Sequence, residues 1–160
     1  MAEDAGLRKH LVEVLRGHGA HADFDEAIRD LPVKLRGAKA KNLPFTPWRL
    51  LEHIRIAQWD ILEFSRNPKH VSPEWPKGYW PTGDAPKSGA AWKASVAAFH
   101  RDLGEMVELV QDPATDLFAL IPQGTGQTVL REALLVADHN SYHLGQMIML
   151  RRLLGAWKSD

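Results

Sequence analysis

The chain has 160 residues, with 20 lysines and arginines, 20 aspartates and glutamates, and no cysteine. This length suits a single domain, residues 1–160, that buries its own hydrophobic core. The lack of cysteine excludes disulfides, thiolate metal ligands and a cysteine nucleophile. Because the opposite charges are balanced and interspersed, the sequence offers no electrostatic basis for binding nucleic acid.

Neither a signal peptide nor a membrane span is predicted. The first ten residues, "MAEDAGLRKH", are acidic where a signal peptide is basic, and no stretch approaches the roughly 20 apolar residues that a membrane span needs. We therefore expect a soluble, cytoplasmic protein without nucleic-acid or membrane partners.

Apolar residues recur at helical spacing along most of the chain, and strand-like alternation is nearly absent. A first helix is predicted over 3–17. A short second helix follows in "HADFDEAIRDLP", where Asp23 and Glu26 form a capping box and Pro32 ends the element. A third helix, to about residue 66, begins with Thr46 as N-cap and Pro47 at its first position.

Two further long helices are predicted over 89–111 and 127–154, with Gly155 closing the last one. The connection 72–89 is long for a small domain and contains four prolines and three glycines. Its Trp75, Tyr79 and Trp80 either clamp it to the helices, which we favour, or line a substrate entrance. The predicted fold class is all-α, an antiparallel four-helix bundle with an extra short helix.

The segment "DHNSYHLGQ", 138–146, places two histidines on one face of the last helix. Their stripe also contains Gln146 and Glu132, whereas the opposite stripe is purely apolar: Leu130, Leu134, Ala137, Leu144 and Ile148. A surface helix needs only one apolar stripe. We expect one stripe to face the bundle interior and the other to pack on a neighbouring helix or a second subunit.

One histidine of the third helix, His53, shares its face with Ala57 and Asp60. If the third and fifth helices are neighbours, His53 can meet His139 and His143 in a metal site that leaves a position open for water or substrate. A core histidine that is hydrogen-bonded through one nitrogen is the commoner arrangement, however, and a lone H-x-x-x-H is a weak signal. Spacing alone leaves both interpretations open.

Several other residues, Gln146 among them, are candidates for supporting or pocket-lining roles. Asp60 and Glu132 could orient ligand imidazoles, although Asp60 is equally typical of a buried structural hydrogen-bonder. His21, which follows His18 around a glycine, is either a turn residue or part of a pocket rim. The remaining histidines, which lack partners at any useful spacing, are expected on the surface: His10, His70 and His100.

A family resemblance rests on "WRLLEHIRIAQWDILEF" and, about 80 residues later, "LLVADHNSYHLGQMIMLRRLLG". One histidine on the second main helix and H-x-x-x-H on the last resemble the DinB/YfiT superfamily of four-helix-bundle proteins, over about residues 5–155. The resemblance implies a divalent metal ion, nickel or zinc, held by His53, His139 and His143, and a homodimer. It also implies the activities of relatives, which include thiol-dependent transferases, isomerases and proteins described as metal-dependent hydrolases.

The residues near the histidines favour one of these chemistries. A hydrolytic site needs a carboxylate that takes a proton from water, and Asn140, Ser141 and Tyr142 separate the two histidines instead. A thiol is deprotonated by coordination and needs no such base. We therefore expect a metal-dependent enzyme for a small-molecule substrate, with a low-molecular-weight thiol as cosubstrate, at a site that opens at one end of the bundle. Otherwise the enzyme is a hydrolase whose base comes from an apposed loop. The alternative class is a non-catalytic metal-binding or small-ligand-binding protein, or a dimeric structural module.

Overall fold

The computed structural model describes residues 2–157, whose regular elements are all helical. The long helices are α1 (Ala2–Leu15), α3 (Pro47–Arg66), α4 (Gly89–Gln111) and α5 (Val129–Leu153). The short ones are α2 (Phe24–Ile28) and the 3-10 turns η1 (Val33–Leu35) and η2 (Lys77–Tyr79). No helix in residues 2–157 has the length and apolar character that a membrane crossing requires.

The helices begin and end where the capping residues predict. The Thr46 hydroxyl accepts a hydrogen bond from the Arg49 amide at the start of α3, and Asp23 and Glu26 form the expected capping box of α2. Gly155, just past α5, has φ +67°, a left-handed conformation that glycine adopts without strain. The sequence prediction of the helices is confirmed to within a few residues.

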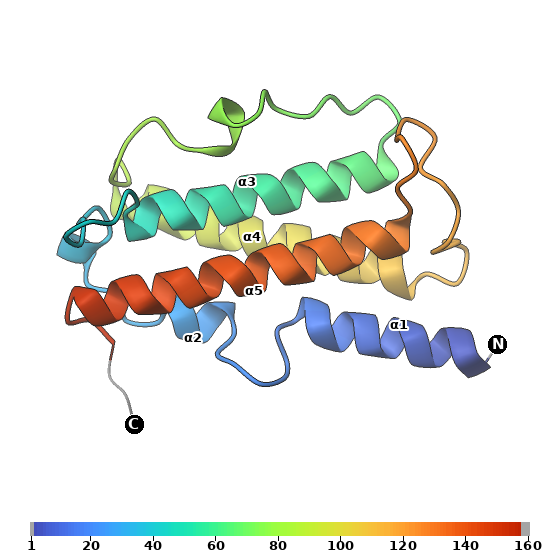
Figure 1. The fold of residues 1–160 in the computed structure, drawn as a ribbon, viewed down its shortest axis with the longest axis horizontal. Helices are drawn as coiled ribbons and strands as arrows, with labels where there is room; N and C mark the ends of the chain where they lie inside the picture. Colours follow the sequence, from blue (N-terminus) through green and yellow to red (C-terminus); the bar gives the residue numbers. More distant parts are fainter. Residues whose placement is uncertain (1, 158–160) are drawn as a thin grey trace.

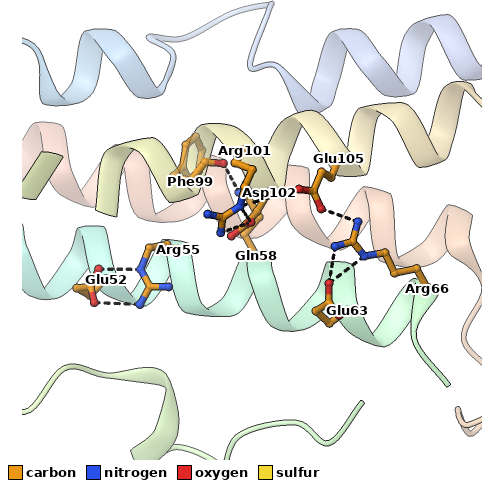
Figure 2. Close-up of polar contacts among 9 residues, drawn as sticks. All are labelled: Glu52, Arg55, Gln58, Glu63, Arg66, Phe99, Arg101, Asp102 and Glu105. Atoms are coloured by element: carbon orange, nitrogen blue, oxygen red, sulfur yellow. Dashed lines mark hydrogen bonds and ion pairs between the residues drawn. The ribbon is translucent and has the colours of Figure 1, made fainter. Parts of the chain in front are cut away.

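The four long helices pack as a bundle, in which α1 and α5 run opposite to α3 and α4 (Figure 1). The bundle class is confirmed, but α3 and α4 are parallel. Contacts between these two helices advance in step, as Figure 2 shows for the middle and last pairs: Ser95 with Glu52, Phe99 with Gln58, and Glu105 with Arg66.

The parallel pair requires a long connection, because α3 and α4 both begin at the same end of the bundle. A helix of 20 residues, like α3, is about 30 Å long. Residues 67–88 return over this distance, along the outside of α3 (Figure 1). The proline-rich segment is therefore a crossover loop, and an antiparallel neighbour would not have needed it.

Buried apolar side chains form two clusters along the bundle, and a polar layer separates them. One cluster includes Ile61 and Met106, and the other includes Ile54 and Leu144. Between them, Asn140 of α5 donates to Gln58 of α3, whose amide donates to the Phe99 carbonyl of α4. This network satisfies a buried carbonyl and joins three helices through side-chain amides.

The buried face of α5 differs from the two-stripe expectation. The residues that lie between the predicted stripes are themselves buried: Val129, Ala133, Val136, Asn140 and Met147. The histidine stripe and the apolar stripe are thus the two edges of a single broad inner face. Leu134, assigned to the apolar stripe, is 48% exposed. The second stripe consequently gives no evidence for a second subunit.

Candidate metal centre

Three histidines from two antiparallel helices converge beneath the crossover loop. His53 projects from α3, and His139 and His143 project from α5 one turn apart. One ring nitrogen from each lies within 4.8 Å of the others. His53 and His143 are buried and His139 is partly buried. The group joins the second turn of α3 to the middle of α5. The expected opening at one end of the bundle stays a prediction.

Hydrogen bonds on the outer ring nitrogens determine the tautomers of two imidazoles. The Nδ1–H of His53 donates to the Tyr79 carbonyl at 2.9 Å, and that of His143 donates to Gln146 Oε1 at 2.8 Å. Each Nε2 is therefore unprotonated in the neutral ring. The two Nε2 atoms face each other at 3.1 Å, a separation at which two acceptors cannot form a hydrogen bond.

The third imidazole cannot resolve this conflict. His139 Nε2 lies 3.2 Å from His53 Nε2, and the buried Nδ1 of His139 has no hydrogen-bond partner. A proton on His139 Nε2 would satisfy the contact with His53 and leave His143 unpaired. One ring nitrogen of each histidine therefore faces a shared position between the three rings. A single cation at this position would satisfy all three nitrogens.

The surroundings favour neutral imidazoles, which is the form that binds metal. Burial, and then the proximity of His143 and His53, lowers the pKa of His139 to about 3. Burial also lowers the pKa of His53, opposed by its hydrogen bond to Tyr79, and the pKa of His143, opposed by Gln146. At neutral pH a metal ion would displace no proton from these rings.

The spacing of the nitrogens fits a transition-metal ion. Ligand nitrogens 2.0–2.1 Å from a tetrahedral ion are about 3.3 Å apart, close to the separations of 3.1 and 3.2 Å seen here. Among residues 2–157 the group contains only these three possible ligands. The residues fit a three-histidine site with a free coordination position, the arrangement found in catalytic rather than structural zinc sites.

The other candidates from the sequence lie at different distances from the cluster. Gln146 contacts it directly, through His143. Asp60 contacts none of the three rings and instead accepts hydrogen bonds from Tyr79 and His70. Glu132 is buried two turns before His139 in α5, and its carboxylate accepts a hydrogen bond from Arg131.

His21 is exposed, and its Nδ1 contacts only the neighbouring Ala22 carbonyl, so the structure does not bring it to the cluster. His70 was expected on the surface, and this is wrong: its side chain is 6% exposed and its Nε2 donates to Asp60 at 2.7 Å. His10 and His100 are exposed, as expected.

The sequence analysis named the aromatic residues of the loop but did not connect them with His53. Trp80 stacks on the His53 ring, with centroids 4.0 Å apart and planes at 1°. It also stacks with Phe45, and the Arg49 guanidinium lies over its ring. Tyr79 supplies the carbonyl that His53 contacts. These two aromatics clamp the loop, as favoured above, whereas Trp75 is 71% exposed. Only the parallel arrangement of α3 and α4 would have placed this loop over His53.

No carboxylate is available at the cluster among the described residues. Asp60 and Glu132 are engaged as described above, and Glu52, next to His53 in sequence, accepts from Arg55 and Ser95. None of them contacts an imidazole of the cluster. The site therefore offers metal ligands without an adjacent general base.

Comparison with known proteins agrees with this arrangement. The family model described as the DinB superfamily matches residues 17–147, which include α2, α3, α4 and α5 as far as Met147. No curated protein and no solved structure matches the chain. Because the matched segment covers most of the chain and includes all three histidines, the protein belongs to the DinB superfamily.

Proposed function

We propose that the protein is a metal-dependent enzyme that holds one divalent cation, zinc or nickel, through His53, His139 and His143. The observation that carries the proposal is the 3.1 Å contact between His53 Nε2 and His143 Nε2, two acceptors whose tautomers are set by Tyr79 and Gln146. Imidazole suits several first-row ions, so cellular supply decides which one is bound.

We propose thiol-dependent transfer as the reaction class, with a low-molecular-weight thiol as cosubstrate. A bound cation would supply Lewis acidity that deprotonates a coordinated thiol without help from a protein base. The lack of a carboxylate beside the three rings in the described part of the chain supports this choice over hydrolysis. The three histidines would hold the cation. Burial keeps their rings neutral, and the hydrogen bonds to Tyr79 and Gln146 leave the Nε2 atoms of His53 and His143 unprotonated.

Elemental analysis tests the metal-binding part of the proposal. Untagged protein, purified without a metal resin, should contain about one zinc or nickel per chain. His53→Ala, His139→Ala and His143→Ala should each lose it, and His100→Ala, which alters an exposed histidine of α4, should retain it. Folded protein that neither contains metal nor takes up added zinc or nickel would contradict the proposal.

Activity assays then separate the reaction classes. Metal-loaded protein should transfer low-molecular-weight thiols to electrophilic acceptors, and it should not hydrolyse ester or amide substrates when thiol is omitted. Hydrolysis without thiol would indicate the second candidate, a hydrolase with a base from outside the cluster. A metal-loaded protein that is inactive with both substrate types would be a metal-binding protein without catalysis.

We also propose that the protein forms a homodimer. Supporting this, three large apolar residues at helical spacing are exposed on the outer side of α5: Tyr142 (64%), Met149 (55%) and Leu153 (59%). Sedimentation of the wild type should give twice the mass of the chain, and Met149→Lys should shift the protein toward monomer. A monomeric wild type would contradict the dimer without affecting the metal site.

A further inference from the structure

The crossover loop follows α3 in the reverse direction and contacts it at successive points. His70 reaches Asp60, Tyr79 reaches both Asp60 and His53, and the Asp84 carbonyl accepts from Thr46 at the start of the helix. The loop thus covers the part of α3 that contains His53 and Asp60. It joins the helix by side-chain contacts rather than by regular secondary structure.

Asp60 holds two parts of this loop at once. Its Oδ1 accepts from His70 Nε2 at 2.7 Å, and its Oδ2 accepts from the Tyr79 hydroxyl at 2.6 Å. Asp60 is 7% exposed, so these bonds form largely without competing water. Burial, with the hydrogen bond to Asp60, raises the pKa of Tyr79 to about 12, and the hydroxyl therefore stays a donor over the physiological range.

Tyr79 joins Asp60 to the histidine cluster through a single residue. Its hydroxyl is held by Asp60, while its carbonyl accepts from His53 Nδ1 at 2.9 Å. The next residue, Trp80, lies flat on the His53 ring. The side chain and the main chain of one loop residue consequently act on α3 at two positions that are two turns apart, Asp60 and His53.

We propose that Asp60 is a positioning residue for the metal centre, and that it acts through Tyr79. By anchoring the Tyr79 ring, Asp60 holds the Tyr79 carbonyl against His53 Nδ1, which keeps the proton on Nδ1 and the lone pair of Nε2 directed toward His139 and His143. The inference rests on the proposed metal-binding role of His53. Carbonyl and carboxylate partners of this kind orient ligand imidazoles in known metal sites.

Two nearly isosteric variants test this role, Tyr79→Phe and Asp60→Asn. Tyr79→Phe removes one oxygen from a half-buried ring and leaves the carbonyl in the chain, so the fold is retained. The matched control is Ser95→Ala, which removes another 2.6 Å hydroxyl–carboxylate bond to α3, from Ser95 to Glu52, on the side of the helix that faces α4.

The first measurement is the tautomer of His53 in metal-free protein, from the nitrogen chemical shifts of its imidazole at neutral pH. His53→Gln identifies its resonances. We expect the Nδ1–H form in the wild type and in Ser95→Ala, and a mixture with the Nε2–H form in Tyr79→Phe and Asp60→Asn. The second measurement is zinc affinity by competition with a chromophoric chelator, where we expect about 10–100-fold weaker binding in both variants and no comparable loss in the control.

The two measurements separate this inference from the proposed function. Unchanged His53 tautomers in Tyr79→Phe and Asp60→Asn would overturn the positioning role, and so would zinc affinities equal to that of Ser95→Ala. A wild type that binds neither zinc nor nickel would refute the proposed function, and the tautomers of the metal-free variants would still decide whether Asp60 acts on His53.

Discussion

At the scale of single residues, the shifted pKa values of two buried groups change the stability of the fold with pH in opposite directions. Burial lowers the pKa of His139 to about 3, so the folded protein keeps this ring neutral under conditions in which the unfolded chain protonates it near 6.5. Burial raises the pKa of Asp102, whose Oδ2 has no hydrogen-bond partner. Each shift predicts how stability depends on pH.

Metal-free protein should lose stability as the pH falls below about 6.5, because the unfolded state then binds more protons than the folded one. His139 alone should contribute up to about 1.4 kcal/mol per pH unit between that value and its folded pKa of about 3. Urea unfolding between pH 7.5 and 5, with chelator present, measures this slope. His139→Gln should show a shallower decline, and equal slopes for both proteins would contradict the expectation.

Asp102→Asn should stabilise the protein by about 1 kcal/mol at pH 7.5, because it removes a charge from a side chain that is 3% exposed. Its partner Arg101 is 61% exposed and can be solvated without the carboxylate. The gain should shrink as the pH falls toward the raised pKa of Asp102, where the wild-type carboxyl becomes neutral.

Chemical denaturation at two pH values measures this effect. The control Glu105→Gln, one turn further along α4, should bring no gain because Glu105 pairs with Arg66 (Figure 2). A loss of stability in Asp102→Asn would mean that the Arg101 ion pair outweighs the cost of burying the charge.

At the scale of the elements, arginines hold the carboxyl ends of helices that have few basic residues of their own. Arg8 of α1 donates to the carbonyls of Val110 and Asp112 at the end of α4, and to that of Thr115. Likewise, Arg151 of α5 donates to the carbonyls of Ala27 and Arg29 at the end of α2. A cation at these unsatisfied carbonyls also complements the helix dipole.

Arg8→Met should therefore lower the free energy of unfolding by about 2 kcal/mol, because it leaves several carbonyls at the end of α4 without this donor. The control Lys9→Met, on the same helix with a side chain 73% exposed, should change it by less than about 0.5 kcal/mol. Urea denaturation of both variants measures the difference. Similar effects of the two substitutions would show that the contacts of Arg8 are not stabilising.

At the scale of the whole molecule, the histidine cluster connects α3 to α5 across the bundle, so a bound metal should act as a cross-link specific to the folded state. Zinc at about 100 times its dissociation constant should raise the free energy of unfolding by about 2.7 kcal/mol. The increase should disappear in His143→Ala. Thermal melts with and without zinc measure it, and an equal increase in the variant would place the ion elsewhere.

The sequence by itself determined the helices, and its family resemblance indicated which three histidines would come together. Capping residues such as Thr46 and Asp23 act within a few positions, and the spacing of His139 and His143 already places both on one helix face, because these effects are local. His53 joins these two histidines only if α3 packs against α5, and local sequence patterns do not determine that packing.

Only the tertiary structure decided that α3 and α4 are parallel, that the loop 67–88 crosses α3, that Tyr79 and Trp80 contact His53, and that Asp60 holds Tyr79. It also showed that His70 is buried and that Glu132 and His21 lie away from the cluster. Helical periodicity defines the face on which a residue lies but contains no information on the direction of the next helix or the path of the loop that reaches it. Those depend on contacts between residues far apart in the chain, and only packing selects them.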